Sequence, residues 1–103
     1  MLFGLSEETI NKINTVFNEY SSVEKVIIYG SRVKGTNKNG SDIDLTLYGT
    51  NLSLHVQQKI EIELDDLMLP YKIDLSIYTK IKNYDLKEHI DRIGKIFYQK
   101  KAE

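Results

Sequence analysis

Three aspartates have the spacing needed for metal-assisted chemistry. Asp42 and Asp44 are two residues apart in an alternating segment. On a strand, both carboxylates would project to the same side, about 7 Å apart at a rise of roughly 3.3 Å per residue. Asp74 lies on the polar side of a later alternating segment. If these strands are neighbours, the three charges repel one another unless divalent cations neutralise them. The alternative for Asp42 and Asp44 is an ordinary turn position, because D-x-D alone is a weak signal.

A second group precedes the aspartate pair. The apolar run Val26–Tyr29 ends at Gly30-Ser31, and ten residues separate Ser31 from Asp42. A glycine at a strand end lets a phosphate approach the backbone closely, and the serine hydroxyl and following amides can donate to its oxygens. A phosphate-binding turn beside a two-metal carboxylate site is what phosphoryl or nucleotidyl transfer requires.

The elements that must position these residues can be read from periodicity. Apolar spacing predicts helices over residues 6–20, 53–68 and 84–93, with a helical turn over 32–35. Apolar or alternating runs predict strands over 26–29, 42–48 and 72–78, with a short extended tail over 95–98. The first strand is continuously apolar, so we expect it near the centre of the sheet. The predicted class is α/β (α+β), with one sheet faced by helices.

Composition bounds the kind of protein. At 103 residues with a net charge of −1, we expect a single domain over residues 1–103 that has no general attraction for nucleic acid or anionic membranes. There is no cysteine, so any metal must be held by oxygen or imidazole, and oxygen ligands favour Mg²⁺ or Mn²⁺. We find no signal peptide and no membrane-spanning run, and expect a cytoplasmic protein.

Two motifs carry a resemblance to a known family. Gly30–Gly35 (GSRVKG) followed by Ser41–Leu45 (SDIDL), with a later strand aspartate at Asp74, resembles the DNA polymerase β-like nucleotidyltransferase superfamily. Within it, the chain looks like the minimal nucleotidyltransferases (MNT), which are short catalytic domains, and the resemblance covers nearly the whole chain. Val33 stands where many members have alanine, a departure that does not touch the chemistry. The resemblance implies one mixed sheet of about three to four strands.

The resemblance also implies roles for individual residues. Asp42 and Asp44 would hold two Mg²⁺ ions, with Mn²⁺ as a possible substitute, and Asp74 would complete the metal site and help activate the acceptor hydroxyl. Gly30 and Ser31 would contact the β- and γ-phosphates of ATP, the expected substrate. Arg32 would add charge beside the triphosphate, and its alternative is a solvated loop arginine.

The same resemblance also implies a partner protein. Minimal nucleotidyltransferases typically work beside a small helical protein of the HEPN type, and as antitoxins they adenylylate a HEPN ribonuclease toxin. Two alternatives stay open: a subunit that modifies a small molecule bound by a partner, and a catalytically silent antitoxin that acts by contact. Homo- or hetero-oligomers are also open. We expect His55 and His89 at the surface, Lys34 and Lys38 facing solvent, and Tyr29, Tyr48 and Tyr78 packed on strands.

Overall fold

The computed structural model describes residues 1–101. Its elements, in chain order, are α1 (Glu7–Asn18), β1 (Val23–Tyr29), α2 (Ser31–Lys34), β2 (Ile43–Gly49), α3 (Leu54–Asp66), β3 (Ile73–Ile77), the 3-10 turn η1 (Tyr78–Lys80), α4 (Tyr84–Ile93) and β4 (Lys95–Gln99). The predicted helices and strands are all present, within a few residues of their expected ends. None of the helices in residues 1–101 combines the length and the apolar character needed to cross a bilayer.

The four strands form one mixed sheet in the order β3-β2-β1-β4. β1 runs antiparallel to both of its neighbours, β2 and β4, whereas β2 and β3 are parallel. β1 is therefore an interior strand, as its continuous apolar run predicted. The tail over residues 95–98 pairs with β1 and becomes the edge strand β4, so the sheet has the mixed pairing and strand number expected.

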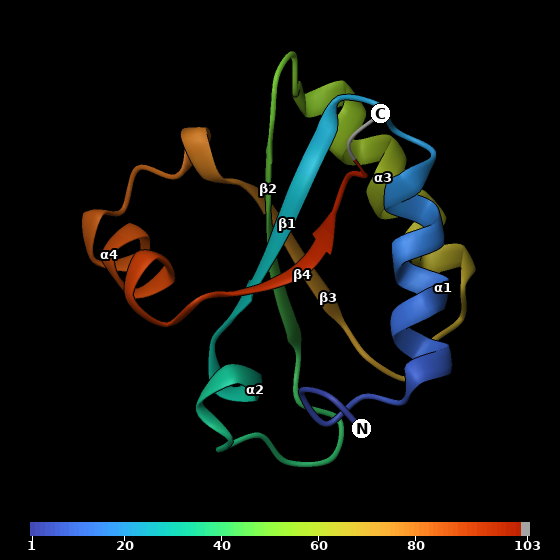
Figure 1. Cartoon of the computed structure of the whole chain (residues 1–103), viewed down its shortest axis with the longest axis vertical. Coiled ribbons are helices and arrows are strands. Elements are labelled where there is room, and N and C mark those ends of the chain that lie inside the picture. Colours follow the sequence, from blue (N-terminus) through green and yellow to red (C-terminus); the bar gives the residue numbers. More distant parts are fainter. Residues whose placement is uncertain (102–103) are drawn as a thin grey trace.

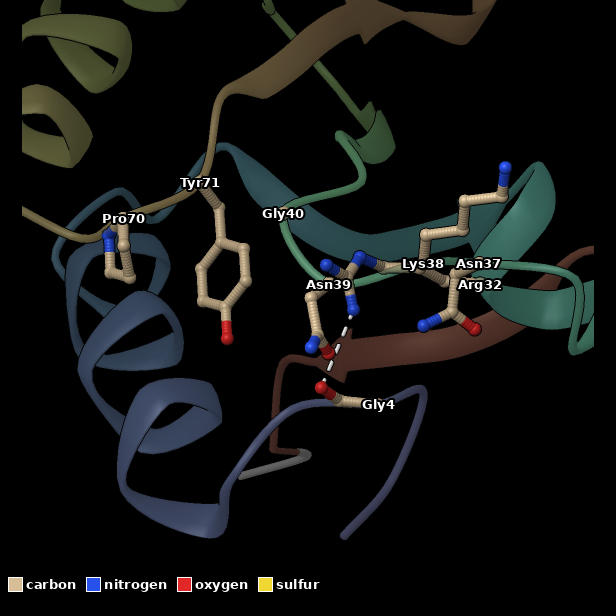
Figure 2. A pocket seen from close by; sticks show the side chains of 8 residues that line it. All are labelled: Gly4, Arg32, Asn37, Lys38, Asn39, Gly40, Pro70 and Tyr71. Atoms are coloured by element: carbon tan, nitrogen blue, oxygen red, sulfur yellow. Dashed lines mark hydrogen bonds between the residues drawn. The ribbon is translucent and has the colours of Figure 1, made fainter.

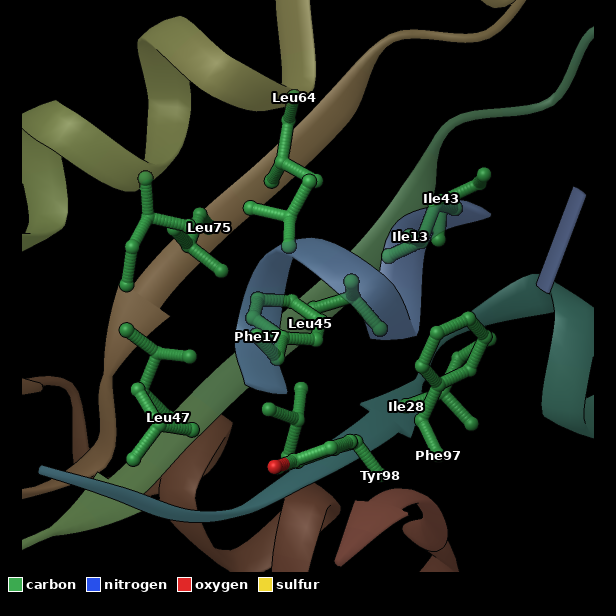
Figure 3. Packing of buried hydrophobic residues seen from close by; sticks show 14 of the residues in the cluster. Ile13, Phe17, Ile28, Ile43, Leu45, Leu47, Leu64, Leu75, Phe97 and Tyr98 are labelled. Atoms are coloured by element: carbon green, nitrogen blue, oxygen red, sulfur yellow. The ribbon is translucent and has the colours of Figure 1, made fainter. Parts of the chain in front are cut away.

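Helices cover both faces of this sheet. α1 and α3 lie on one face, and α4 lies on the other (Figure 1). The larger core cluster lies between the sheet and the helices α1 and α3, and Figure 3 shows Ile13 and Phe17 of α1 packed against strand residues. A smaller cluster of Ile27, Tyr29 and Ile90 lies under α4. Burying both faces of β1 is what its continuous apolar sequence requires.

Side-chain caps set where the helices begin. The Ser6, Ser53 and Asn83 side chains each accept a hydrogen bond from the backbone amide three residues later, as N-caps do. Two helices end earlier than predicted. α1 stops at Asn18 rather than near Tyr20, and α3 stops at Asp66 rather than at residue 68. Met68 has a φ of 56°, a left-handed conformation that cannot continue a right-handed helix.

Candidate active site

Two of the three predicted catalytic aspartates lie side by side near the start of the parallel β2–β3 pair, and the third flanks them. Asp44 of β2 is the register partner of Asp74 of β3, so neighbouring strands place these two carboxylates side by side. Asp42 immediately precedes β2. Asp44 is half-buried, while Asp42 and Asp74 are exposed. The sheet therefore brings the three predicted residues to one end of one face, on the side that carries α4.

The charges in this group act on one another. Burial raises the pKa of the Asp44 carboxyl above its usual range, and the nearby carboxylates of Asp74 and then Asp42 raise it further. The positive charge of Arg32 opposes this shift and is the smallest of the four causes. The site thus holds more negative charge than the protein compensates, which is the electrostatic setting that divalent cations stabilise.

Gly30 joins the predicted phosphate-binding turn to the aspartates. It follows the last residue of β1, Tyr29, which pairs with Asp44 in the register of β1 and β2. Gly30 has a φ of 82°, and a Cβ there would collide with the Asp44 carboxylate oxygen Oδ2. Only glycine fits this position without moving Asp44. The turn at Gly30-Ser31 and the carboxylate of Asp44 are therefore in direct contact.

The Ser31 turn is open to a ligand. Ser31 is half-exposed and begins the four-residue helix α2, and Gly35 after the helix has a left-handed conformation with a φ of 77°. The carbonyl of Gly30 accepts hydrogen bonds from the amides of Val33 and Lys34. The amides at the start of a helical turn have no partner inside it. The Ser31 hydroxyl and the first amides of the turn, those of Ser31 and Arg32, can therefore serve as donors beside the aspartates.

Tyr29 packs beside the carboxylates on the α4 side of the sheet. Its ring meets the His89 ring edge-on, with centroids 6.1 Å apart. Burial raises the pKa of the Tyr29 phenol, a hydrogen bond with Ser76 opposes this, and the charges of Asp44 and Asp74 raise it again. Packing was the expected role of Tyr29. His89, expected at the surface, is instead half-buried against this ring.

Arg32 makes contacts that its sequence position does not reveal. Its side chain is only 4% exposed, and it donates to the carbonyls of Ser41, Phe3 and Gly4. Its guanidinium also lies over the ring of Tyr71, 4.9 Å from the centroid. Arg32 is therefore not a solvated loop arginine, the alternative considered for it, and its contact with the triphosphate stays a prediction.

Arg32 and Tyr71 help to line a pocket of about 390 Å³ (Figure 2). Its other lining residues are Gly4, Asn37, Lys38, Asn39, Gly40 and Pro70. None of the three aspartates lines this pocket, so it is separate from the carboxylate group. Sequence reasoning missed this arrangement because the residues come from three segments with no shared motif.

The donor set at the aspartates fits a hard divalent cation. All candidate ligands there are carboxylate oxygens, and the chain has no cysteine. Within residues 1–101, no three acidic or histidine side chains are gathered closely enough to form a complete metal site. The strand pairing of Asp44 with Asp74 places two carboxylates side by side that could hold such a cation, and Asp42 flanks this pair as a third candidate ligand.

Comparison with known proteins decides the family. Residues 11–103 match the profile of the family described as Polymerase beta, Nucleotidyltransferase. The chain belongs to this nucleotidyltransferase family. The resemblance found in the two sequence motifs is thereby confirmed for more than four-fifths of the chain. No curated protein sequence matches this nucleotidyltransferase at a significant level.

Solved structures share the fold of this nucleotidyltransferase. A chain from a crystal structure of a toxin–antitoxin complex with AMP-PNP superposes with a TM-score of 0.70 at 20% identity, covering 93% of this chain and 75% of that chain. A chain from the tri-AMPylated Shewanella oneidensis HEPN toxin in complex with MNT antitoxin gives a TM-score of 0.68 at 15% identity, covering 93% and 74% of the two chains. These likenesses confirm a nucleotidyltransferase fold with one mixed sheet.

Proposed function

We propose that this protein transfers AMP from ATP to an acceptor hydroxyl in a Mg²⁺-dependent reaction. The observation that carries the proposal is the direct contact between the Gly30 turn and Asp44, with Asp44 paired to Asp74. This contact supports the proposal because a turn that could donate hydrogen bonds to phosphate lies against the Asp44 carboxylate. Membership of a nucleotidyltransferase family supports the same reaction class.

The proposed reaction forms one bond and breaks one. The acceptor oxygen attacks the α-phosphorus of ATP, the bond between that phosphorus and the α–β bridging oxygen breaks, and pyrophosphate leaves. Gly30 and Ser31 bind the β- and γ-phosphates and so hold the leaving group. Asp74 lies beside Asp44 and accepts the proton of the attacking hydroxyl. Bound at Asp42, Asp44 and Asp74, Mg²⁺ would activate the attacking oxygen and stabilise the leaving one.

We further propose that the acceptor is a hydroxyl on a HEPN-type partner protein, which this chain modifies as an antitoxin. Support comes from the solved complexes of similar fold, one of which contains a tri-AMPylated HEPN toxin with its MNT antitoxin. Asp42 and Asp74 are exposed, so the carboxylate group is accessible to a residue on the surface of another protein.

Transfer of label from α-³²P-ATP tests this proposal. The wild-type protein is incubated with Mg²⁺ and the product of the neighbouring gene, alongside an Asp42→Asn/Asp44→Asn double variant. We expect label on the partner with the wild type and none with the double variant. Label on a small molecule would identify a different acceptor. Neutralisation of the partner by both proteins without any label would show that the chain acts by contact alone.

A further inference from the structure

One arginine side chain spans the two halves of the proposed site. Arg32 directly follows Ser31 of the phosphate-binding turn, and its Nε and Nη2 atoms both donate to the carbonyl oxygen of Ser41, at 3.2 and 2.7 Å. Ser41 directly precedes Asp42. The guanidinium therefore links the two ends of the loop that runs from the Ser31 turn to the aspartate pair.

The other side of the same guanidinium holds the N-terminal segment. Nη1 donates to the carbonyls of Phe3 at 2.9 Å and Gly4 at 3.4 Å. This segment is itself fixed, because Leu5 is fully buried and its backbone exchanges two hydrogen bonds with Leu2. Arg32 thus ties the loop to the N-terminal turn at Phe3-Gly4, which the buried Leu5 anchors in the core.

These contacts account for the buried charge. A buried cation is tolerated when its donors are satisfied, and four contacts to three carbonyls use most of the five N–H groups of Arg32. No carboxylate forms a salt bridge with it among the described residues. Its face is covered by the ring of Tyr71, three residues before Asp74. A lysine cannot copy this planar, multiply donating arrangement.

We propose that Arg32 is a positioning residue that fixes Ser41, and through it Asp42, relative to Ser31. The inference rests on the proposed nucleotidyl transfer and assigns Arg32 a role through the backbone in place of a contact with the triphosphate. Holding the loop keeps the phosphate-binding turn and the carboxylates at the separation that the reacting groups need. A misplacement of about 1 Å at such a site can lower the rate about 100-fold.

The test compares Arg32→Lys and Arg32→Gln with Arg92→Lys, which changes the exposed arginine of α4. Amide hydrogen exchange over residues 36–42 reports on the loop without any need for activity. We expect faster exchange over these residues in both Arg32 variants and wild-type exchange rates in the Arg92 control. In the transfer assay, we expect kcat to fall about 100-fold, with KM for ATP changed by less than about threefold.

Gly4→Ala provides a second variant that leaves Arg32 in place. A Cβ at Gly4 would lie 3.0 Å from Nη1 of Arg32 and 2.7 Å from Nδ2 of Asn37, so it presses on the same contacts. Gly35→Ala is its matched control, with a similar left-handed φ of 77° and no atom near the added methyl. We expect faster loop exchange and a smaller loss of kcat in Gly4→Ala only.

Two results would overturn the positioning role. A raised KM for ATP with unchanged kcat would show that Arg32 binds the triphosphate directly. Wild-type loop exchange in the Arg32 variants would show that the guanidinium does not hold the loop. A wild-type protein that labels no acceptor would refute the proposed function instead, and the exchange measurements would still decide whether Arg32 holds the loop.

Discussion

At Gly30, a missing side chain makes room for a carboxylate. The residue combines a left-handed backbone with direct contact against Asp44, so two separate constraints exclude a larger residue. We expect Gly30→Ala to displace Asp44 and lower transfer about 100-fold, because a shift of about 1 Å is enough for such a loss. Labelled transfer from ATP measures the effect.

Gly35→Ala separates the two constraints at Gly30. Gly35 has nearly the same φ, yet an added Cβ there meets nothing within 4 Å. Both variants should lose about 1–3 kcal/mol of unfolding free energy from backbone strain, measured in urea. Only Gly30→Ala should lose transfer, and an equal loss of activity in both variants would contradict the assigned contact.

The aspartate site should also reduce the stability of the fold at neutral pH. Asp44 has a raised pKa in the folded protein, against an ordinary value of 3.8. As pH rises above that value, the folded chain retains a proton that the unfolded chain has lost, so the free energy of unfolding falls. We expect Asp44→Asn to be more stable than the wild type at about pH 7 and nearly equal at about pH 3, where both states are protonated.

Urea unfolding at the two pH values measures this difference. Glu24→Gln serves as the control, because it removes an exposed carboxylate at the opposite end of β1 from Tyr29, the residue that pairs with Asp44. A gain in Asp44→Asn that is the same at both pH values would mean that charge repulsion is not its cause.

At the scale of elements, local patterns predicted most of the fold. Ser6 and the apolar spacing after it marked α1, and the unbroken apolar run of β1 predicted its interior place in the sheet. The pairing of β2 with β3 could only be supposed, because it depends on long-range contacts. The role of Arg32 could not be predicted from the sequence, because its partners Phe3 and Gly4 lie 28 or more residues away in the chain.

β4 is the element whose importance the sequence understated. Its residue Phe97 is only 7% exposed, and its ring lies 6.3 Å from that of Phe3, which also contributes a carbonyl to Arg32. We expect Phe97→Ala to lower the free energy of unfolding by about 3 kcal/mol, through lost burial and the cavity left behind. Urea unfolding is the measurement.

Ile96→Ala is the matched control on the same strand. Ile96 is 55% exposed, so its truncation should cost less than about 1 kcal/mol. Similar losses in the two variants would show that β4 is not anchored in the core through Phe97.

At the scale of the whole molecule, ligand binding should offset the carboxylate repulsion. We expect Mg²⁺ with an α,β-methylene analogue of ATP to raise the thermal unfolding midpoint of the wild type. At 100 times the dissociation constant, binding adds about 2.7 kcal/mol to the free energy of unfolding. Asp42→Asn/Asp44→Asn should show little of this gain, and an equal gain in both proteins would place the ligand elsewhere.

Which phosphate of ATP is transferred tests the central claim most directly. The protein and its partner are incubated with Mg²⁺ and ATP labelled at either the α- or the γ-phosphate. Nucleotidyl transfer predicts that the acceptor gains label from α-³²P-ATP only, with the γ-label released in pyrophosphate. Label from γ-³²P-ATP on the acceptor would mean phosphoryl transfer, and would contradict the roles given to Gly30, Ser31 and the three aspartates.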